Sequence, residues 1–173
     1  MWYDYPEINE QLGKVEEIIR KNIKIRNSLL KNVVEGLVSA GGKRLRPAFV
    51  ILSSKFGPKN NDNILNVAGA IEILHTATLV HDDIVDRSML RRGKTTVAND
   101  YGLDMAVYTG DFLLTVAVLM LSGNIENDKL ELIAKAVKAI CEGEIEQYRD
   151  KYNINTSILS YLKKIRRKTA ILF

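Results

Sequence analysis

His75–Thr96 reads HTATLVHDDIVDRSMLRRGKTT and places three carboxylates within five positions, at Asp82, Asp83 and Asp86. Apolar residues before these aspartates recur at roughly helical spacing, so we expect a helix that runs through them. On a helix, Asp82 and Asp86 share one face about one turn apart, and Asp83 flanks that face. Like charges at this spacing repel each other and weaken an isolated helix. The stretch therefore predicts that a cation lies between the carboxylates.

The chemistry of this stretch suits a magnesium ion and a phosphate group. Mg²⁺ binds one or two carboxylates, keeps several waters and fills its remaining positions with substrate phosphate oxygens. Arg91, Arg92 and Lys94 follow in a segment that contains a glycine, and basic side chains of this kind bind phosphate. Each group alone could equally be a solvated helix end or ordinary surface charge. The joint pattern of Asp-Asp-x-x-Asp, four residues and Arg-Arg-Gly favours a binding site.

A second basic motif, GGKRLRP, occupies residues 41–47. Glycines let backbone N–H groups approach an anion, and the start of the following helix adds its positive dipole end. Lys43, Arg44 and Arg46 supply three positive charges beside that helix start. The alternative is an ordinary helix stop followed by a basic helix start. The motif is therefore a candidate anion site, and the rest of the chain must decide between the two interpretations.

Together the two motifs resemble those of the trans-polyprenyl diphosphate synthases, a family of chain-elongating prenyltransferases. The resemblance extends from about Gly36 to Phe173. It implies an all-α fold, an antiparallel helix bundle of the isoprenoid synthase type, in which residues 1–173 form a single helical domain, the N-terminal portion of such a bundle. It also implies a reaction in which isopentenyl diphosphate condenses with an allylic diphosphate after magnesium-assisted ionisation to an allylic cation.

For isopentenyl diphosphate, the resemblance implies four contacts: Lys43, Arg46, His75 and Arg92. A lone histidine on a helix is more often a packed core or surface residue. The position of His75, seven residues before the first aspartate, nevertheless matches the family. His81 has no implied role beyond packing or an outer hydrogen bond.

For the allylic diphosphate, the implied contacts are Arg91, Gln147, Lys168 and Thr169. The resemblance makes Mg²⁺ the cofactor, held by Asp82 and Asp86. Asp83 is implied to help position the metal through water, and Lys168 to stabilise the cation, so that the implied catalytic group is Asp82, Asp83, Asp86 and Lys168. Residues 110–113, Gly-Asp-Phe-Leu, resemble a family segment that faces the substrate cavity, although a buried aspartate could equally be structural.

Small residues about one turn before Asp82 bear on product length. Ala77 and Thr78 lie five and four residues upstream, where a prenyl tail growing away from the aspartates would meet the helix. A bulky aromatic here stops elongation in similar enzymes. Two small residues therefore predict a medium- or long-chain all-trans product. The alternative is that Ala77 is small only to let helices pack closely.

The sequence contains no second Asp-Asp-x-x-Asp, whereas the family carries one downstream of its Lys-Thr pair. We therefore expect a truncated chain, or half of a site that another chain completes, with little activity alone. A homodimer or a heteromer is implied. Two alternatives stay open: a non-catalytic partner or regulatory subunit that retains the fold and the diphosphate-binding groups, and a related head-to-head synthase or terpene cyclase.

The composition fits a soluble globular chain of 173 residues, 46% hydrophobic and 27% charged. The net charge of +4 is modest, and no aromatic residue interleaves with the basic run Lys163–Lys168 to stack bases, so we expect no nucleic-acid partner. We expect no signal peptide and no transmembrane segment, because the most apolar run, Phe112–Leu121, is shorter than the roughly 20 residues of a membrane span. A cytoplasmic protein follows by default. Cys141 is predicted to be a buried core thiol.

Helical spacing dominates the chain. We expect helices over about residues 7–40, with a break near Asn27–Ser28, and over about 47–56, 64–85, 102–121, 128–148 and 158 onward. The helix over 102–121 is predicted to be buried on nearly all faces. Asp128 and Glu131 resemble a capping box, and Thr156 or Ser157 a helix N-cap. Residues 87–100 are predicted to form a loop.

Overall fold

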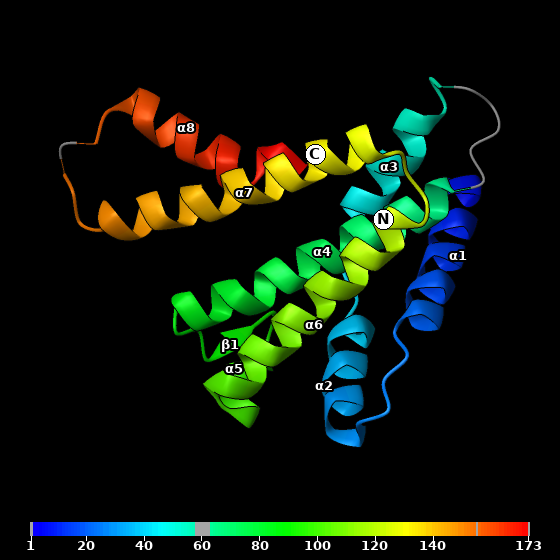
Figure 1. The fold of residues 1–173 in the computed structure, drawn as a ribbon, viewed down its shortest axis with the longest axis horizontal. Coiled ribbons are helices and arrows are strands. Elements are labelled where there is room, and N and C mark those ends of the chain that lie inside the picture. The colour runs from blue at the N-terminus through cyan, green and yellow to red at the C-terminus, as the bar shows by residue number, and fades with distance from the viewer. Residues whose placement is uncertain (1, 58–62, 155, 173) are drawn as a thin grey trace. The chain divides into compact units, whose positions relative to one another are not determined.

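The structure, a computed structural model, describes residues 2–57, 63–154 and 156–172 (Figure 1). The elements in chain order are α1 (Pro6–Asn22), α2 (Ser28–Ser39), α3 (Leu45–Ser54), α4 (Ile64–Val85), β1 (Leu90–Arg91), β2 (Lys94–Thr95), α5 (Val97–Tyr101), α6 (Leu103–Ser122), α7 (Asn127–Arg149), α8 (Ile158–Lys168) and the 3₁₀ helix η1 (Ala170–Leu172). The predicted all-α class is confirmed, because the two short strands form only one hairpin within the described residues.

The chain divides into two compact units, Met1–Asn124 and Ile125–Phe173. The first contains α1 to α6, and the second contains α7, α8 and η1. Each unit is described by itself below. The single domain over residues 1–173 stays a prediction.

Helix α4 is the centre of the first unit. It packs against α6, α3 and α1, and Figure 1 shows α4 and α6 side by side. Small residues make these approaches possible. A Cβ added at Gly69 would lie 3.3 Å from both Ile19 Cγ1 of α1 and Met120 Cε of α6. The apolar burial of α4 is greatest over Ala68–Leu74, and the aspartates follow near its C-terminal end.

The predicted break of the first helix near Asn27–Ser28 is confirmed. Helix α1 ends at Asn22, and α2 begins at Ser28. Asn27 caps α2, since its Oδ1 accepts a hydrogen bond from the Leu30 N–H at 3.0 Å. An asparagine that satisfies a helix N-terminus starts a new helix instead of continuing the old one, which explains the break.

The predicted loop over 87–100 is wrong in detail, because it contains an antiparallel hairpin and a short helix. Leu90 pairs with Thr95, and Arg91 pairs with Lys94. The connecting residues Arg92 and Gly93 have φ angles of 52° and 78°. Positive φ at both central positions is the type I′ turn that matches the twist of a two-stranded ribbon.

Helix α6 is not buried on nearly all faces, as its composition had suggested. Its inner face holds Leu113 and Ala117, both 0% exposed. Its other face includes Tyr108 and Leu119, each 66% exposed. The helix is apolar on both sides, so hydropathy could not separate the packed face from the open one.

In the second unit, three ion pairs join α7 to α8. Lys164 Nζ lies 2.8 Å from an Asp150 oxygen, Lys168 Nζ lies 3.0 Å from the Glu144 carboxylate, and Arg167 pairs with Glu146. Later residues of α8 pair with earlier residues of α7, so the two helices run antiparallel. The basic run of α8 is therefore largely matched by acidic residues.

Three local predictions in this unit can be compared with the structure. Ser157 is the N-cap of α8, as predicted, and its Oγ accepts from the Ser160 N–H at 3.2 Å. The capping box is wrong, because α7 begins at Asn127 and Asp128 lies inside its first turn. Cys141 is exposed and is not a core thiol.

Among the described residues, α4 and α6 are long and apolar enough to cross a membrane by length and composition alone. The most apolar window of α4 is 50% buried and that of α6 is 44% buried. Core helices of soluble proteins pass the same test, so this is weak support for a membrane span.

Candidate active site

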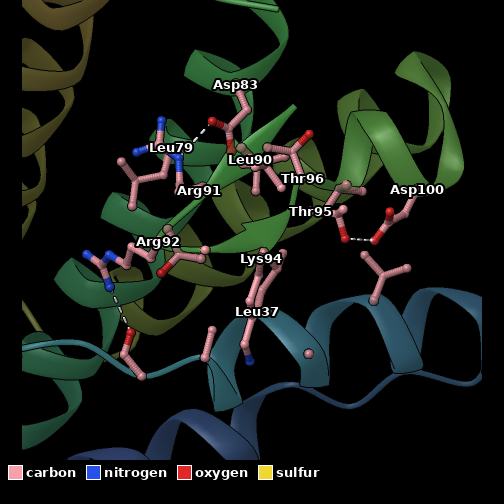
Figure 2. A pocket seen from close by; sticks show the side chains of 18 of the residues that line it. Leu37, Leu79, Asp83, Leu90, Arg91, Arg92, Lys94, Thr95, Thr96 and Asp100 are labelled. Carbon is pink, nitrogen blue, oxygen red and sulfur yellow. Dashed lines mark hydrogen bonds and ion pairs between the residues drawn. The ribbon is translucent and has the colours of Figure 1, made fainter. Parts of the chain in front are cut away.

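A cavity of about 580 Å³ opens in the first unit between α2, α4 and the β1–β2 hairpin (Figure 2). Helix α4 contributes three side chains spaced one turn apart, His75, Leu79 and Asp83. Helix α2 contributes apolar side chains that include Val33 and Leu37. One end of the cavity is basic and the opposite end reaches α5, so the cavity combines a charged end with apolar walls.

The basic end surrounds His75. Burial, together with the positive charges of Arg46, Arg92 and Arg91, lowers the pKa of His75 to about 4. Burial also lowers the pKa of the Arg46 guanidinium, which the Glu72 carboxylate opposes. The imidazole is therefore neutral at pH 7 and can donate a hydrogen bond, while three arginines set a positive potential around it. This combination suits an anion.

The hairpin turn brings Arg92 to the Gly41–Pro47 loop. Arg92 Nη1 donates a hydrogen bond to the Gly41 carbonyl at 2.8 Å, which Figure 2 shows at the lower left. A Cβ added at Gly42 would lie 2.8 Å from the same Nη1, so a glycine is needed for this approach. The two basic motifs, about fifty residues apart in the sequence, therefore meet.

The two predicted ligands in the segment 41–47, Lys43 and Arg46, differ in exposure and in their position relative to the cavity. Lys43 is exposed and does not line the cavity, and its carbonyl accepts from Trp2 Nε1 at 2.7 Å. Arg46 is half-buried at the start of α3, and its charge acts on His75. Of the four predicted isopentenyl diphosphate contacts, His75 and Arg92 line the cavity directly and Arg46 lies close enough to act on His75.

The three aspartates do not share one environment. Asp83 is buried and its Oδ1 accepts from Arg91 Nε at 2.7 Å inside the cavity (Figure 2). Asp82 is half-buried, and Asp86 is exposed at the C-cap of α4. Asp83 therefore holds Arg91 in place. Asp82 and Asp86 do not line the cavity, and they lie about one turn apart on the neighbouring face of α4.

Oxygen donors at this spacing fit a hard divalent cation. No group of three or more histidine, cysteine, aspartate or glutamate side chains is arranged to hold a metal within the described ranges. Two carboxylates are nevertheless the usual protein contribution to a magnesium site, since water and substrate phosphate complete its octahedron. The donor set of Asp82 and Asp86 fits that chemistry.

Ala77 and Thr78 lie on different sides of α4. Thr78 is half-buried, one turn before Asp82, and its Oγ1 donates to the His75 carbonyl at 2.7 Å. Ala77 is 1% exposed and belongs to the packed interior. Placing both on the face of Asp82 was wrong for Ala77, because five residues advance a helix by about 140° beyond a full turn. Their effect on product length stays a prediction.

The remaining predicted residues belong to the second unit. Gln147 is exposed on α7, and Thr169 is the C-cap of α8. Lys168 Nζ lies 3.0 Å from the Glu144 carboxylate. Their contact with an allylic diphosphate stays a prediction.

Comparison with known proteins decides the family. The polyprenyl synthetase family matches residues 27–173. The chain belongs to the polyprenyl synthetase family. Component 2 of heptaprenyl diphosphate synthase from Bacillus subtilis (strain 168) is 38% identical over 168 residues, which are 97% of this chain and 48% of that relative. The chain spans about half the length of the curated relatives it matches.

Solved structures of the family agree with the fold. Heptaprenyl diphosphate synthase from Staphylococcus aureus matches with a TM-score of 0.91 and 42% identity, over 95% of this chain and 52% of that one. A polyprenyl synthase from Caulobacter crescentus CB15, complexed with calcium and isoprenyl diphosphate, matches with a TM-score of 0.90 and 36% identity, over 95% and 50%. The predicted isoprenoid synthase type of bundle is confirmed.

The structure of this polyprenyl synthetase chain also contains contacts whose partners the sequence did not name. His81 lies against Gly110, where a Cβ would be 2.3 Å from Nε2, and its Nε2 is 3.3 Å from Asp111 Oδ1. Asp111 therefore joins α6 to α4 beside the aspartates. Glu72, an acidic residue inside the apolar run of α4, is 8% exposed. A charge in such a run indicates a buried partner, and this signal was present in the sequence.

Proposed function

We propose that the protein that carries this chain is a prenyltransferase. It condenses isopentenyl diphosphate with an allylic diphosphate and makes a medium- or long-chain all-trans polyprenyl diphosphate. The observation that carries the proposal is the basic end of the cavity, where Arg46, Arg91 and Arg92 surround His75. Family membership supports the same reaction, because the relatives are named for prenyl diphosphate synthesis.

The basic end is the proposed site of isopentenyl diphosphate. Arg46 and Arg92 bind the diphosphate, and neutral His75 donates a hydrogen bond to it. Lys43 reaches the same anion from the loop. Guanidinium groups suit this task because they bind phosphate oxygens in pairs and stay charged.

Asp82 and Asp86 are the proposed ligands of Mg²⁺. When bound, the metal supplies Lewis acidity that neutralises charge on a leaving diphosphate. The Caulobacter crescentus polyprenyl synthase is complexed with both calcium and isoprenyl diphosphate, which supports a role for a divalent cation. Asp83 contributes indirectly, because its carboxylate fixes Arg91.

The chain's own residues are proposed to guide the bond changes. Arg91 binds the allylic diphosphate while its carbon–oxygen bond breaks and leaves an allylic cation. The double bond of isopentenyl diphosphate attacks that cation and forms the new carbon–carbon bond. The departed diphosphate takes the proton, so no protein base is needed. Apolar walls exclude the water that would quench the cation.

The product is proposed to be longer than a short-chain prenyl diphosphate. Thr78 lies one turn before Asp82, and Ala77 follows the packed side of the same helix. Neither side chain is bulky, so neither blocks a growing tail. Heptaprenyl and octaprenyl diphosphate synthases among the relatives support this length.

A partner chain is a second part of the proposal. Two relatives carry the name component 2 of heptaprenyl diphosphate synthase, and we infer that this chain also works with another chain. The alternative is a non-catalytic partner or regulatory subunit that retains the fold and the diphosphate-binding groups. Catalysis by the assembled protein that depends on Asp82 of this chain would exclude that alternative.

The test is an assay that follows labelled isopentenyl diphosphate into an extended product, with and without magnesium. It is run on the protein that carries this chain, with any partner chain present. We expect magnesium-dependent extension that is lost in the Asp82→Ala variant. Equal extension by the variant and the wild type would contradict the assignment of the metal ligands, and no extension in any assembly would contradict the reaction.

A further inference from the structure

Arg44 stands in the middle of the basic loop, yet its side chain is turned into the protein. The Arg44 guanidinium donates from Nε to Glu16 Oε1 at 3.2 Å, from Nη1 to Glu72 Oε1 at 2.7 Å and from Nη2 to the Val38 carbonyl at 3.2 Å. The side chains of Arg44 and Glu72 are each 11% exposed. All three nitrogens of Arg44 therefore have partners within the protein.

These contacts join four elements at one point. Glu16 belongs to α1, Val38 to α2 and Glu72 to α4, and Arg44 itself is the N-cap of α3. Glu72 lies three residues before His75 on α4. A buried ion pair contributes most when its geometry is good and further hydrogen bonds accompany it, and here Arg44 adds two hydrogen bonds to the 2.7 Å contact with Glu72. The pair fixes the loop against the helix that carries His75.

The backbone of the loop is itself in an uncommon conformation. Arg44 has φ 49° and ψ 36°, the left-handed region that residues other than glycine rarely occupy. Such conformations persist where surrounding contacts hold them. The same loop presents the Gly41 carbonyl to Arg92. Loss of the Arg44 contacts would free the loop and, with it, the placement of Arg92.

We infer that Arg44 is a positioning residue of the diphosphate site, held by Glu72 so that the loop aims Lys43, Arg46 and Arg92 at one anion. This inference rests on the proposed function, because it needs the basic end of the cavity to bind a diphosphate. Its rival is that Arg44 binds the anion directly and that Glu72 only competes with it. The two accounts predict opposite effects of removing the Glu72 charge.

The test is a calorimetric titration of inorganic pyrophosphate, without divalent metal, into the protein that carries this chain. Glu72→Gln removes a negative charge near the anion. If Arg44 is a positioning residue, Glu72→Gln weakens pyrophosphate binding, by about tenfold for a lost charged hydrogen bond. If Arg44 is a ligand, the variant binds pyrophosphate more tightly. Glu35→Gln, at an exposed α2 residue, is the control for charge alone and is expected to change little.

A double variant provides a second test if Glu72→Gln does not fold. Arg44→Met with Glu72→Met leaves the net charge unchanged, and replacing both members of a buried pair by apolar residues is often neutral for stability. Circular dichroism checks that the variant is folded. We expect it, too, to bind pyrophosphate about tenfold more weakly.

The outcomes separate the inference from the proposed function. No binding by the wild-type chain would overturn the diphosphate site and the inference together. Binding by the wild type, with equal or tighter binding by Glu72→Gln or by the folded double variant, would overturn the inference alone.

Discussion

The basic end of the cavity, around His75, and the acidic C-terminal end of α4, at Asp82 and Asp86, are built in different ways. At the basic end, Arg91 pairs with Asp83 at 2.7 Å, and Arg92 donates to the Gly41 carbonyl at 2.8 Å. At the acidic end, Asp86 is exposed at the C-cap of α4, where the helix dipole is negative and disfavours a carboxylate. The fold itself holds the arginines in place, whereas Asp86 lies at a helix end where its charge is disfavoured and a bound cation would offset it. The basic end should therefore bind its ligand without metal, and the acidic end should not.

Removing an aspartate should have the largest effect and should separate the two ends. In the active protein, Asp82→Ala or Asp86→Ala is expected to lower turnover by about a thousandfold or more, because leaving-group stabilisation is worth several kcal/mol. Metal-free pyrophosphate binding should be retained in both variants. Steady-state kinetics and calorimetry measure the two quantities. A parallel loss of pyrophosphate affinity would mean that the ends are not independent.

Removing a single arginine from the hairpin should weaken the basic end alone. Arg92→Gly takes away the guanidinium while leaving a residue that accepts the φ of 52° at this position. We expect pyrophosphate affinity to fall by about tenfold to a hundredfold, as for lost charged hydrogen bonds. Arg87→Gly is the matched control, because Arg87 has φ 51°, is exposed and does not line the cavity. Similar losses in both variants would point to general charge and not to a site.

The acidic end was easier to predict from sequence than the basic end. The positions of Asp82 and Asp86 follow from the helical period alone, which is local information. The turn at Arg92 has no such signal, since a non-glycine residue takes positive φ there and its side chain is held by Gly41, far away in the sequence. The ion pair of Asp83 has no such signal either, because the hairpin brings its partner Arg91 to it. The role of Asp83 in positioning the metal stays a prediction.

Other differences also have a tertiary origin. Periodicity identified α6, but a helix that is apolar on both sides does not reveal which face is packed. Ala77 was assigned by its distance from Asp82 along the chain, whereas the angle around the helix decides its burial. The caps of α2 and α8 are local hydrogen bonds, and only that of α8 was recognised in the sequence.

The length of the product tests the small residues that precede Asp82 on α4. In an active form of the protein, Ala77→Phe or Thr78→Phe is expected to shift products to shorter chains, sized by chromatography. Ala77→Phe should also cost about 1–3 kcal/mol of stability, because Ala77 is 1% exposed and the new ring overpacks the interior. An unchanged product distribution with activity retained in both variants would mean that the tail runs elsewhere.

The free energy of unfolding should depend on pH through the protonation of His75 at the basic end. The pKa of His75 is about 4, below its ordinary value of 6.5, so the unfolded chain binds the proton more readily. The resulting stabilisation is present above pH 6.5 and is lost as the pH falls towards 4. We expect urea denaturation at several pH values to show a smaller loss of unfolding free energy over this interval in His75→Gln than in the wild type. Identical pH profiles would contradict the lowered pKa of His75.

The most direct measurement is the pKa of the His75 imidazole by NMR, with and without inorganic pyrophosphate and without metal. In the free chain, the account predicts a pKa of about 4, set by burial and by Arg46, Arg92 and Arg91. A bound pyrophosphate adds negative charge beside the ring and offsets these arginines, so the pKa of His75 should rise. Spectra of the His75→Gln variant assign the signal. A His75 pKa that pyrophosphate at saturating concentration leaves unchanged would contradict the claim that this pocket is a preformed diphosphate site.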